Sequence, residues 1–244
     1  MSAAHRNARH IALPQIGEDG QKSIANSRAL IIGMGGLGCP AATYLACAGI
    51  GELLLNDFDS IDATNLGRQV LYSEIDIGKL KAAVAAERLS ALNPAVNIEA
   101  IESRLSTEEL RQLISSVDIV LDASDNFSTR FNVNDACVKS ETCLISGAAI
   151  RLEGQLAVFG PNYAESACYA CLYTEADESL DNCAGNGVLA AVPGVIGTMM
   201  AVEALKILAG NKPATGSLRL YDATANQFTQ VKINKRQDCS VCFD

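Results

Sequence analysis

The stretch Ala29-Leu30-Ile31-Ile32-Gly33-Met34-Gly35-Gly36-Leu37-Gly38 decides the fold. Its first four residues are apolar, as in a buried strand, and the glycines that follow predict a tight turn. Pro40 then opens a segment of small residues that runs to Gly49 with helical spacing, and proline is favoured in the first turn of a helix. The stretch therefore predicts a strand, a glycine turn and a helix in succession.

The same alternation continues on the C-terminal side of this unit. A second apolar run, Leu53–Leu55, ends in Asn56-Asp57-Phe58-Asp59 and completes a βαβ unit of the expected length. Further helices are predicted over residues 78–92, 127–140 and 195–209, and one more is opened by the capping box Ser106-Thr107-Glu108-Glu109. Further strands are predicted over 96–101, 118–121, 143–146, 155–159, 218–221 and 228–233. We expect an α/β fold with a Rossmann-like, mainly parallel sheet flanked by helices, and antiparallel strands at its C-terminal end.

The composition of the 244 residues sets limits on the class of protein. Hydrophobic residues make up 49% and charged residues 19%, which excludes a disordered or collagen-like chain. The formal net charge of −9 argues against a general affinity for nucleic acid or anionic membranes. The polar start, Met1–His10, and the absence of about 18 consecutive apolar residues argue against a signal peptide or membrane span, so we expect a cytoplasmic protein.

The glycine turn predicts a nucleotide site. Its backbone N–H groups can approach a phosphate closely, and the N-terminus of the following helix favours negative charge. Asp57 lies 19 residues after Gly38, where a carboxylate can accept hydrogen bonds from a ribose. On this motif alone NAD, ATP and a turn with no ligand all stay open.

Two cations and one acid favour ATP among these alternatives. Arg68 follows the second strand and Lys81 begins the next helix, and both would suit the charge of a triphosphate. Asp125 follows another strand and could hold Mg²⁺. The competing interpretation is that Arg68 and Lys81 are solvated surface charges and that Asp125 is a helix N-cap.

The cysteines divide into pairs and single residues. Cys168 and Cys171 form one Cys-x-x-Cys pair and Cys239 and Cys242 another, which together predict a closed, structural Zn²⁺ site; a redox dithiol is the alternative. Cys183 stands in an irregular stretch, where a reactive thiolate or an accident of sequence are both open. The remaining cysteines are interpreted as small buried residues: Cys39, Cys47, Cys137 and Cys143.

Taken together, these residues resemble the ThiF/MoeB/HesA family of bacterial enzymes, which are related to the ubiquitin-activating enzymes. The resemblance covers nearly the whole chain. It rests on both cysteine pairs and on the segments Arg6–His10, Gly17–Gln21, Gly33–Gly38, Asp57–Asp59, Asn65–Gln69, Lys81, Asp122–Asn126, Ser146–Arg151 and Gly154-Gln155.

The resemblance implies an adenylyltransferase that uses Mg-ATP. It implies a small ubiquitin-like sulfur-carrier protein of the ThiS or MoaD type as partner, whose C-terminal Gly-Gly carboxylate is joined to AMP with release of pyrophosphate. The carrier then serves thiamine or molybdopterin cofactor biosynthesis. A separate sulfurtransferase or cysteine desulfurase would supply the sulfur.

The resemblance also implies roles for single residues. The catalytic residues would be Arg9, Arg68, Lys81, Asp125 and Cys183. The residues that bind ATP and Mg²⁺ would be Gly33, Gly35, Gly36, Gly38, Asp57, Asp59, Asn65, Arg68, Lys81, Asp125 and Asn126. Arg9 would reach into the site of a second subunit, which implies a homodimer, and Cys183 occupies the place of a loop cysteine that forms a covalent link in some members.

No linker divides the chain, so we expect one domain, 1–244. It would comprise an N-terminal helical arm (1–28), a nucleotide-binding half (29–150) and a carrier-binding and zinc half (151–244). Three alternatives stay open: an NAD-dependent oxidoreductase, a related enzyme that activates a tRNA-base carboxylate, and a non-catalytic scaffold. The oxidoreductase would leave Arg68, Lys81, Asp125 and the cysteine pairs without a purpose.

Overall fold

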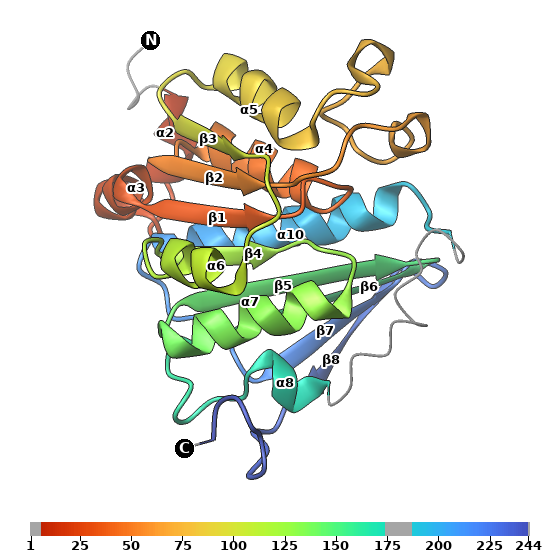
Figure 1. Cartoon of the computed structure of the whole chain (residues 1–244). Helices are drawn as coiled ribbons and strands as arrows, with labels where there is room; N and C mark the ends of the chain where they lie inside the picture. Colours follow the sequence, from red (N-terminus) through yellow and green to blue (C-terminus); the bar gives the residue numbers. More distant parts are fainter. Residues whose placement is uncertain (1–5, 174–186, 244) are drawn as a thin grey trace.

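The computed structural model describes residues 6–173 and 187–243, and its eight strands form one sheet (Figure 1). The strands are β1 (Arg28–Ile32), β2 (Glu52–Asn56), β3 (Asn97–Ile101), β4 (Ile119–Asp122), β5 (Cys143–Ile150), β6 (Glu153–Phe159), β7 (Ser217–Asp222) and β8 (Gln227–Lys232). Their order is β3-β2-β1-β4-β5-β6-β7-β8. The first five strands are parallel and the last three antiparallel, which confirms the expected fold class.

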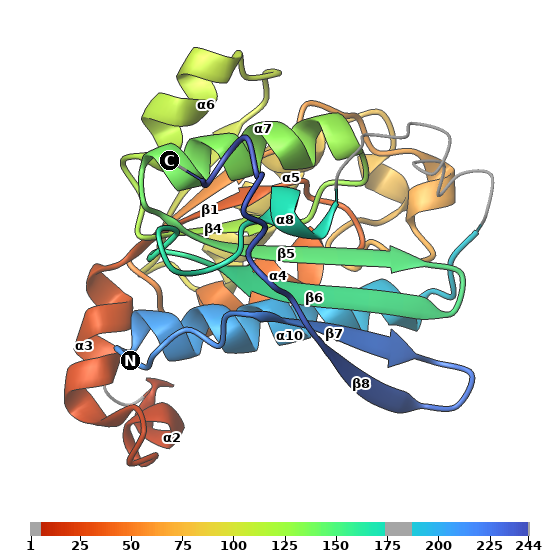
Figure 2. The same cartoon turned by 90° about the horizontal axis from the view of Figure 1, so that it is seen from below.

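Helices cover both faces of the parallel part of the sheet (Figures 1 and 2). One face holds α4 (Gly38–Ala48), α5 (Lys81–Leu92) and α10 (Ala191–Leu208). The other face holds α6 (Thr107–Ile114), α7 (Phe127–Lys139) and α8 (Tyr169–Leu172). The N-terminal arm contains α2 (Ala8–Ile11) and α3 (Gly17–Asn26), and two 3₁₀ turns, η1 (Ala63–Asn65) and η2 (Glu74–Asp76), lie between β2 and α5.

The first strand shows why its sequence is an unbroken apolar run. Ala29 and Ile31 belong to the core under α4 and α10, whereas Leu30 and Ile32 belong to the core under α6 and α7. A strand covered on both faces needs apolar residues at every position. The residues of the run Ala29–Ile32 therefore pack alternately into the two hydrophobic cores on opposite faces of the sheet.

Some element boundaries differ from the sequence prediction. β5 extends to Ile150 instead of ending at 146, because β6 folds back and pairs with it as far as Glu153. α10 begins at Ala191, four residues before the predicted start, and α5 begins at Lys81 because Gly78 has a φ of 86°. The capping box at α6 is confirmed. Cys39, Cys137 and Cys143 are buried as predicted, but Cys47 is only half-buried.

Helix α10 is, within residues 6–173 and 187–243, the one helix long and apolar enough to cross a membrane. Half of its apolar window is buried inside the molecule, against α4, β5 and β6. A core helix of a soluble protein passes the same test of length and composition.

The parallel strands give the molecule two distinct edges. In both cartoons their carboxyl ends point to one side, and α2 and α3 lie on the other side (Figures 1 and 2). Arg6 in this arm donates to the carbonyl of Leu92 (3.1 Å), which precedes β3, and Asn7 packs against Gly49, which precedes β2. The arm therefore lies at the amino ends of the strands, opposite the edge where open α/β sheets bind ligands.

Candidate functional site

The glycine turn lies at the carboxyl end of β1 and is surrounded by backbone. Gly33 has a φ of 91°, and a Cβ on it would lie 2.9 Å from the carbonyl oxygen of Ala123. A Cβ on Gly38, the first residue of α4, would lie 1.9 Å from the carbonyl oxygen of Gly33. These two positions can therefore be occupied only by glycine, because the turn brings β1, β4 and α4 too close together for any side chain.

The outer part of the turn offers hydrogen-bond donors. The backbone N–H groups of Gly35, Gly36 and Leu37 donate to no other residue within the described parts of the chain. They precede an 11-residue helix, whose N-terminus carries a partial positive charge. Such a cradle fits a phosphate group.

Asp57, at the end of β2, is bonded directly to this turn. Its carboxylate accepts hydrogen bonds from the backbone N–H groups of Met34 (2.7 Å) and Asp59 (2.9 Å). Burial raises the pKa of Asp57, whereas the charge of Lys81 and the two hydrogen bonds oppose the rise. The residue predicted to hold the ribose is thus brought beside the phosphate cradle.

Lys81 begins α5 and also lies beside the turn. Its Nζ is 2.9 Å from Asp59 Oδ2, and the Lys81 side chain is 9% exposed whereas that of Asp59 is 56% exposed. Tyr72 Oη donates to the carbonyl of Met34 (2.8 Å) and lies 3.2 Å from the carbonyl of Lys81. The interpretation of Lys81 as a solvated surface charge is therefore wrong.

The segment from Asp62 to Gln69 covers the turn from the other side. The Asn65 side chain accepts a hydrogen bond from the backbone N–H of Asp62 (3.2 Å), and the half-buried Arg68 donates to the carbonyl of Thr64 (2.9 Å). The Arg68 carbonyl lies 3.4 Å from where a Cβ of Gly36 would stand. The backbone of Arg68 therefore borders the glycine turn, whereas the Asn65 side chain is held by Asp62 within its own segment.

The end of β4 supplies the acidic part of the site. Asp125 is exposed, and Asn126 is the N-cap of α7, with its side chain accepting from the backbone N–H of Thr129 (2.8 Å). The alternative that Asp125 is the N-cap is therefore wrong. Carboxylates with an exposed position near phosphates are the ligands that Mg²⁺ prefers, so Asp125 fits the predicted role.

Two buried polar atoms at this edge lack a hydrogen-bond partner in the described structure: Gln69 Oε1 and Asp122 Oδ2. Burial raises the pKa of Asp122, while the charge of Arg130 lowers it. Gln69, Tyr72 and Arg130 are site residues that local sequence patterns do not predict, because their contacts reach across the fold. Buried polar atoms without a hydrogen-bond partner are typical of sites that bind a ligand or a water molecule.

Two predicted site residues are not brought together with the rest. Arg9 lies on α2, at the opposite edge of the sheet from Asp125 (Figure 1). Cys183 lies outside the described residues. The predicted roles of both stay predictions.

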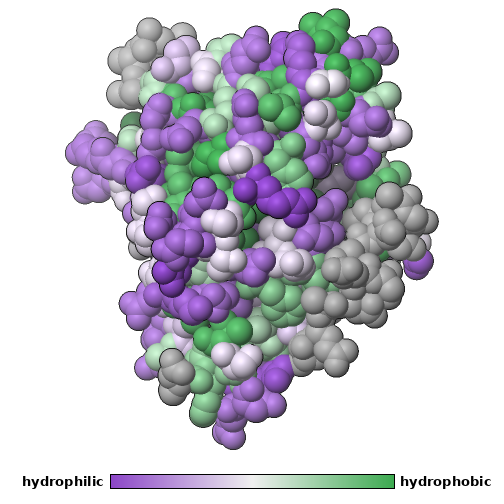
Figure 3. All heavy atoms as spheres, viewed as in Figure 1, coloured by the Kyte–Doolittle hydropathy of each residue, from purple (hydrophilic) through white to green (hydrophobic). Residues whose placement is uncertain are grey.

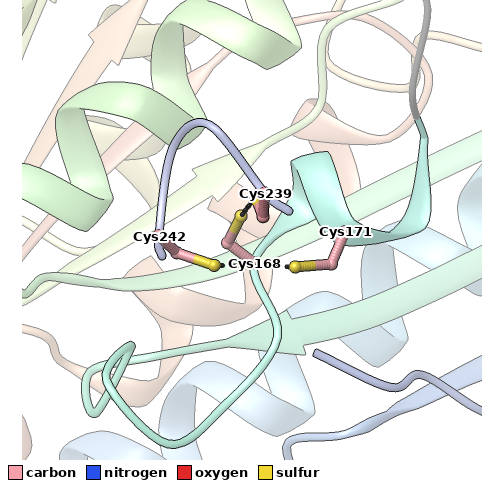
Figure 4. Close-up of side chains that lie close together, drawn as sticks. All are labelled: Cys168, Cys171, Cys239 and Cys242. Carbon is pink, nitrogen blue, oxygen red and sulfur yellow. Dashed lines mark hydrogen bonds between the residues drawn. The ribbon is translucent and has the colours of Figure 1, made fainter. Parts of the chain in front are cut away.

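The four paired cysteines form one cluster (Figure 4). All four are buried, and their sulfur atoms lie within 4.8 Å of one another. The Sγ atoms of Cys168 and Cys239 are 3.7 Å apart, and those of Cys171 and Cys242 are 3.5 Å apart. Zn–S bonds of about 2.3 Å in a tetrahedron place sulfurs about 3.8 Å apart, so the cluster could hold Zn²⁺.

The surroundings of the cluster are arranged for thiolates and a cation. Burial raises the pKa of Cys168 to about 11, whereas at Cys239 hydrogen bonds from Cys242 and its neighbours outweigh burial and lower the pKa to about 7. Asn134 of α7 donates to Cys168 Sγ (3.6 Å) and accepts from the backbone N–H of Tyr169 (2.8 Å). The backbone N–H of Arg236 donates to Cys171 Sγ (3.5 Å). Such outer contacts fix the direction of metal ligands.

Comparison with known proteins agrees with this geometry. The model of the ThiF family matches residues 7–241. Sulfur carrier protein ThiS adenylyltransferase of Escherichia coli K12 is 42% identical over 237 residues, which cover 97% of this chain and 94% of that protein. Molybdopterin-synthase adenylyltransferase of the same strain is 43% identical over 238 residues, which cover 97% and 95%.

A solved structure is also similar. The crystal structure of E. coli MccB with ATP has a TM-score of 0.81 and 25% identity, and the match covers 92% of this chain and 68% of that one. Fold, site geometry and sequence similarity over almost the full length thus agree. The chain belongs to the ThiF family.

Proposed function

We propose that this chain is an adenylyltransferase that joins AMP from ATP to the C-terminal Gly-Gly carboxylate of a ThiS- or MoaD-type sulfur carrier. The observation that carries the proposal is the glycine-rich turn flanked by Lys81 and Asp57. The names of the two relatives from E. coli support the acceptor and its place in thiamine or molybdopterin biosynthesis. A nicotinamide dinucleotide carries a diphosphate and needs no Mg²⁺, so it would give no role to a cation such as Lys81 together with an exposed carboxylate such as Asp125.

Each group at the carboxyl edge has a part in this reaction. The N–H groups of Gly35 and Gly36 hold phosphate oxygens, Asp57 binds the ribose, and Asn65, Arg68 and Lys81 neutralise the triphosphate. Asp59 holds Lys81 before ATP arrives. Mg²⁺ bound by Asp125, beside Asn126, would reduce the negative charge that an attacking carboxylate meets.

The chemistry follows from these positions. The carrier carboxylate oxygen attacks the α-phosphorus of ATP, a new P–O bond forms, and the bond to pyrophosphate breaks. The product is an acyl-adenylate, which a sulfur nucleophile can open, as the sequence analysis predicts for a separate sulfurtransferase or cysteine desulfurase. Alignment of the two reactants in one site supplies most of the acceleration.

ATP–pyrophosphate exchange tests the proposal. We expect exchange with one intact carrier and none with the same carrier lacking its last glycine. Asp125→Ala should lower the exchange rate by about 100-fold or more, because a group at the reacting phosphates is lost. Asp135→Ala is the matched control, since Asp135 forms a surface ion pair with Lys139 on α7 (2.7 Å) and should leave the rate unchanged.

Two outcomes would contradict the proposal. Full exchange by Asp125→Ala would remove Asp125 from the site. No exchange with any carrier, from folded wild-type protein, would favour another acyl substrate or a scaffold. Exchange with only one of the ThiS- and MoaD-type carriers would assign the pathway.

The carrier is proposed to bind to the half formed by residues 151–244. Strand β8 is the last strand of the sheet, and all its residues are exposed, among them Phe228 and Val231. An open strand edge with apolar side chains supports docking of a small folded protein. The cysteine cluster joins Cys239 and Cys242 of the C-terminal tail to Cys168 and Cys171, so zinc would act structurally.

We also propose a homodimer in which Arg9 completes the site of the second subunit. Arg9 lies at the edge opposite the glycine turn, which supports action in another molecule rather than its own. The segment between β2 and α5 exposes Val70 (73%), Ile75 (77%) and Ile77 (47%), next to Arg68. In Figure 3 hydrophobic residues gather at the upper right, over this segment. A second subunit would cover them.

Mixed dimers test this arrangement. Arg9→Ala and Arg68→Ala should each lose exchange, but a mixture of the two should regain about a quarter of the wild-type rate, since a heterodimer keeps one intact site. Sedimentation of the wild-type chain should give a dimer. A mixture that stays inactive, from dimeric protein, would place Arg9 outside the partner's site.

A further inference from the structure

The side chain of Arg130, on α7, is buried behind the acidic part of the site. Its Nη2 donates to the carbonyl of Gly147 in β5 (3.0 Å) and, at closer range, to the carbonyl of Ser124, which follows β4. One guanidinium thus joins the turn after β4 to the middle of the neighbouring strand β5. Arg130 is 9% exposed, and it lines a small cavity together with Gly147 and Tyr173.

Ser124 is held on its other side as well. Asp122 Oδ1 accepts hydrogen bonds from the Ser124 backbone N–H (3.0 Å) and from Ser124 Oγ (2.6 Å). Each polar group of Ser124 therefore has a buried partner. The next residue, Asp125, is exposed at the site, and Asn126 after it is fixed as the cap of α7.

Gly147 provides a fixed reference for this arrangement. A Cβ on Gly147 would lie 2.4 Å from Met200 Sδ of α10 and 3.0 Å from Leu37 of the glycine turn. The strand is therefore pressed against both elements, and its carbonyl cannot shift freely. Through Arg130, the turn that bears Asp125 is positioned relative to the phosphate cradle.

The charge of the buried Arg130 guanidinium carries a desolvation free energy that an apolar side chain at this position would not carry. Burial disfavours the charged guanidinium, and the nearby Asp122 carboxylate offsets this by raising the pKa of Arg130. Apolar residues of similar volume often stabilise a core as well as or better than buried charges. A buried arginine that holds two carbonyls supplies geometry that a hydrophobic side chain cannot supply.

We propose that Arg130 is a positioning residue for Mg-ATP: it sets the direction of Asp125 by holding Ser124 in register with Gly147, and it touches no substrate. The inference rests on the proposed function. It predicts that a defect at Arg130 weakens metal and nucleotide binding together and leaves carrier binding intact.

Arg130→Lys tests the inference, because lysine keeps the charge but its side chain ends one bond short of Nη2, the single nitrogen that reaches both carbonyls. Mn²⁺ serves as probe for Mg²⁺, and its binding in the presence of ATP is followed by electron paramagnetic resonance. We expect the dissociation constant of Mn²⁺ to rise about tenfold, as for other outer contacts of metal sites, and the KM for carrier to change less than about threefold. Ser124→Ala, which keeps the Arg130 contact, should give a smaller change in the same direction.

Arg88→Lys is the control for loss of an arginine hydrogen bond to a buried acceptor, although Arg88 itself is exposed. Arg88 on α5 donates to buried Asp76 (3.1 Å), outside the glycine turn and the end of β4. It should not change Mn²⁺ binding. If Arg130→Lys does not fold, Arg130→Gln, which is polar but uncharged and shorter, takes its place.

An unchanged dissociation constant for Mn²⁺ in folded Arg130→Lys protein would overturn the inference. So would a loss equal for Mn²⁺, ATP and carrier that follows the folded fraction, since that is the mark of a structural residue. The Mn²⁺ titration needs no carrier. Failure of the proposed acyl substrate and failure of this inference are therefore distinguishable.

Discussion

The glycine turn and the cysteine cluster are two sites built on opposite principles. The turn is made of consecutive residues, and what shapes it is the absence of side chains at Gly33 and Gly38. The cluster is made of four side chains, and its pairs join residues 71 positions apart in the sequence. The turn depends on the close approach of backbone atoms where side chains are absent, and the cluster depends on four sulfur atoms that must all be present.

This difference determines how each site fails. An added methyl group would damage the turn, because the nearest atoms are backbone atoms that cannot move aside. A removed sulfur would damage the cluster, because a closed tetrahedral site needs all of its ligands. Substitutions of matched size at the two sites should therefore separate two kinds of loss.

The largest effect is expected for Gly38→Ala. Its Cβ would lie 1.9 Å from the carbonyl oxygen of Gly33, so β1 or α4 must shift. We expect the free energy of unfolding to fall by about 4 kcal/mol or more, at the exceptional end for a single substitution. Urea unfolding followed by circular dichroism measures it.

Gly35→Ala is the matched control within the same turn. The nearest atom to its Cβ would be Gln69 Nε2, at 3.7 Å, which is an ordinary contact. We expect a stability change below about 1 kcal/mol. Equal losses in the two variants would show that the turn is sensitive to backbone freedom rather than to close approach.

A smaller loss is expected when the cluster loses one ligand. Cys168→Ser should lower zinc content and reduce the free energy of unfolding by about 3 kcal/mol, since metal binding at such sites contributes to folding. A strong chelator should act on the wild type in the same direction. Metal analysis and thermal unfolding measure the two effects.

Cys47→Ser is the control for the chemical change alone. Cys47 is half-buried on α4 and is not part of the cluster. It should keep full zinc content. Wild-type stability that does not respond to metal removal would contradict a structural zinc site and would favour a redox dithiol.

The same contrast explains what the sequence could predict. The strand, turn and helix around Gly33–Gly38 follow from neighbouring residues, and so do the capping box of α6 and the Cys-x-x-Cys pairs. Spacing from the turn also predicted Asp57 and Lys81 beside it. Local patterns and strand ends are sufficient for such features, because parallel strands bring their carboxyl ends to one edge.

Other features depend on contacts that no local pattern encodes. Tyr72 reaches Met34 across 38 positions, and Arg130 reaches Gly147 across 17. The full length of β5 depends on β6, which pairs with it as far as Ile150. The position of Arg9 opposite the turn likewise follows only from the folded sheet, in which α2 lies at the amino ends of the strands. In each case the tertiary partner, not the residue itself, defines the role.

Tyr72→Phe tests whether the turn really depends on space alone. The hydroxyl of Tyr72 donates to the carbonyl of Met34, inside the turn, and lies near the carbonyl of Lys81 at the start of α5. If ATP binding needs this side chain, then the turn, like the cysteine cluster, depends on a side chain that is distant in the sequence. Removal of the buried hydroxyl should lower the free energy of unfolding by about 1 kcal/mol, the usual net value of one hydrogen bond.

The informative quantity is ATP affinity measured by calorimetry. We expect the dissociation constant to rise about fivefold, because a link of about 1 kcal/mol between the phosphate cradle and Lys81 is lost. Tyr44→Phe on α4 is the matched control, since Tyr44 is 52% exposed. One outcome is that Tyr72→Phe loses stability but binds ATP as the wild type does. In that outcome the shape of the phosphate cradle depends on Gly33 and Gly38 and not on a side chain, in contrast to the cysteine cluster. If affinity falls as expected, the conformation of the glycine turn also depends on the hydrogen bond from Tyr72, a side chain 38 residues away in the sequence.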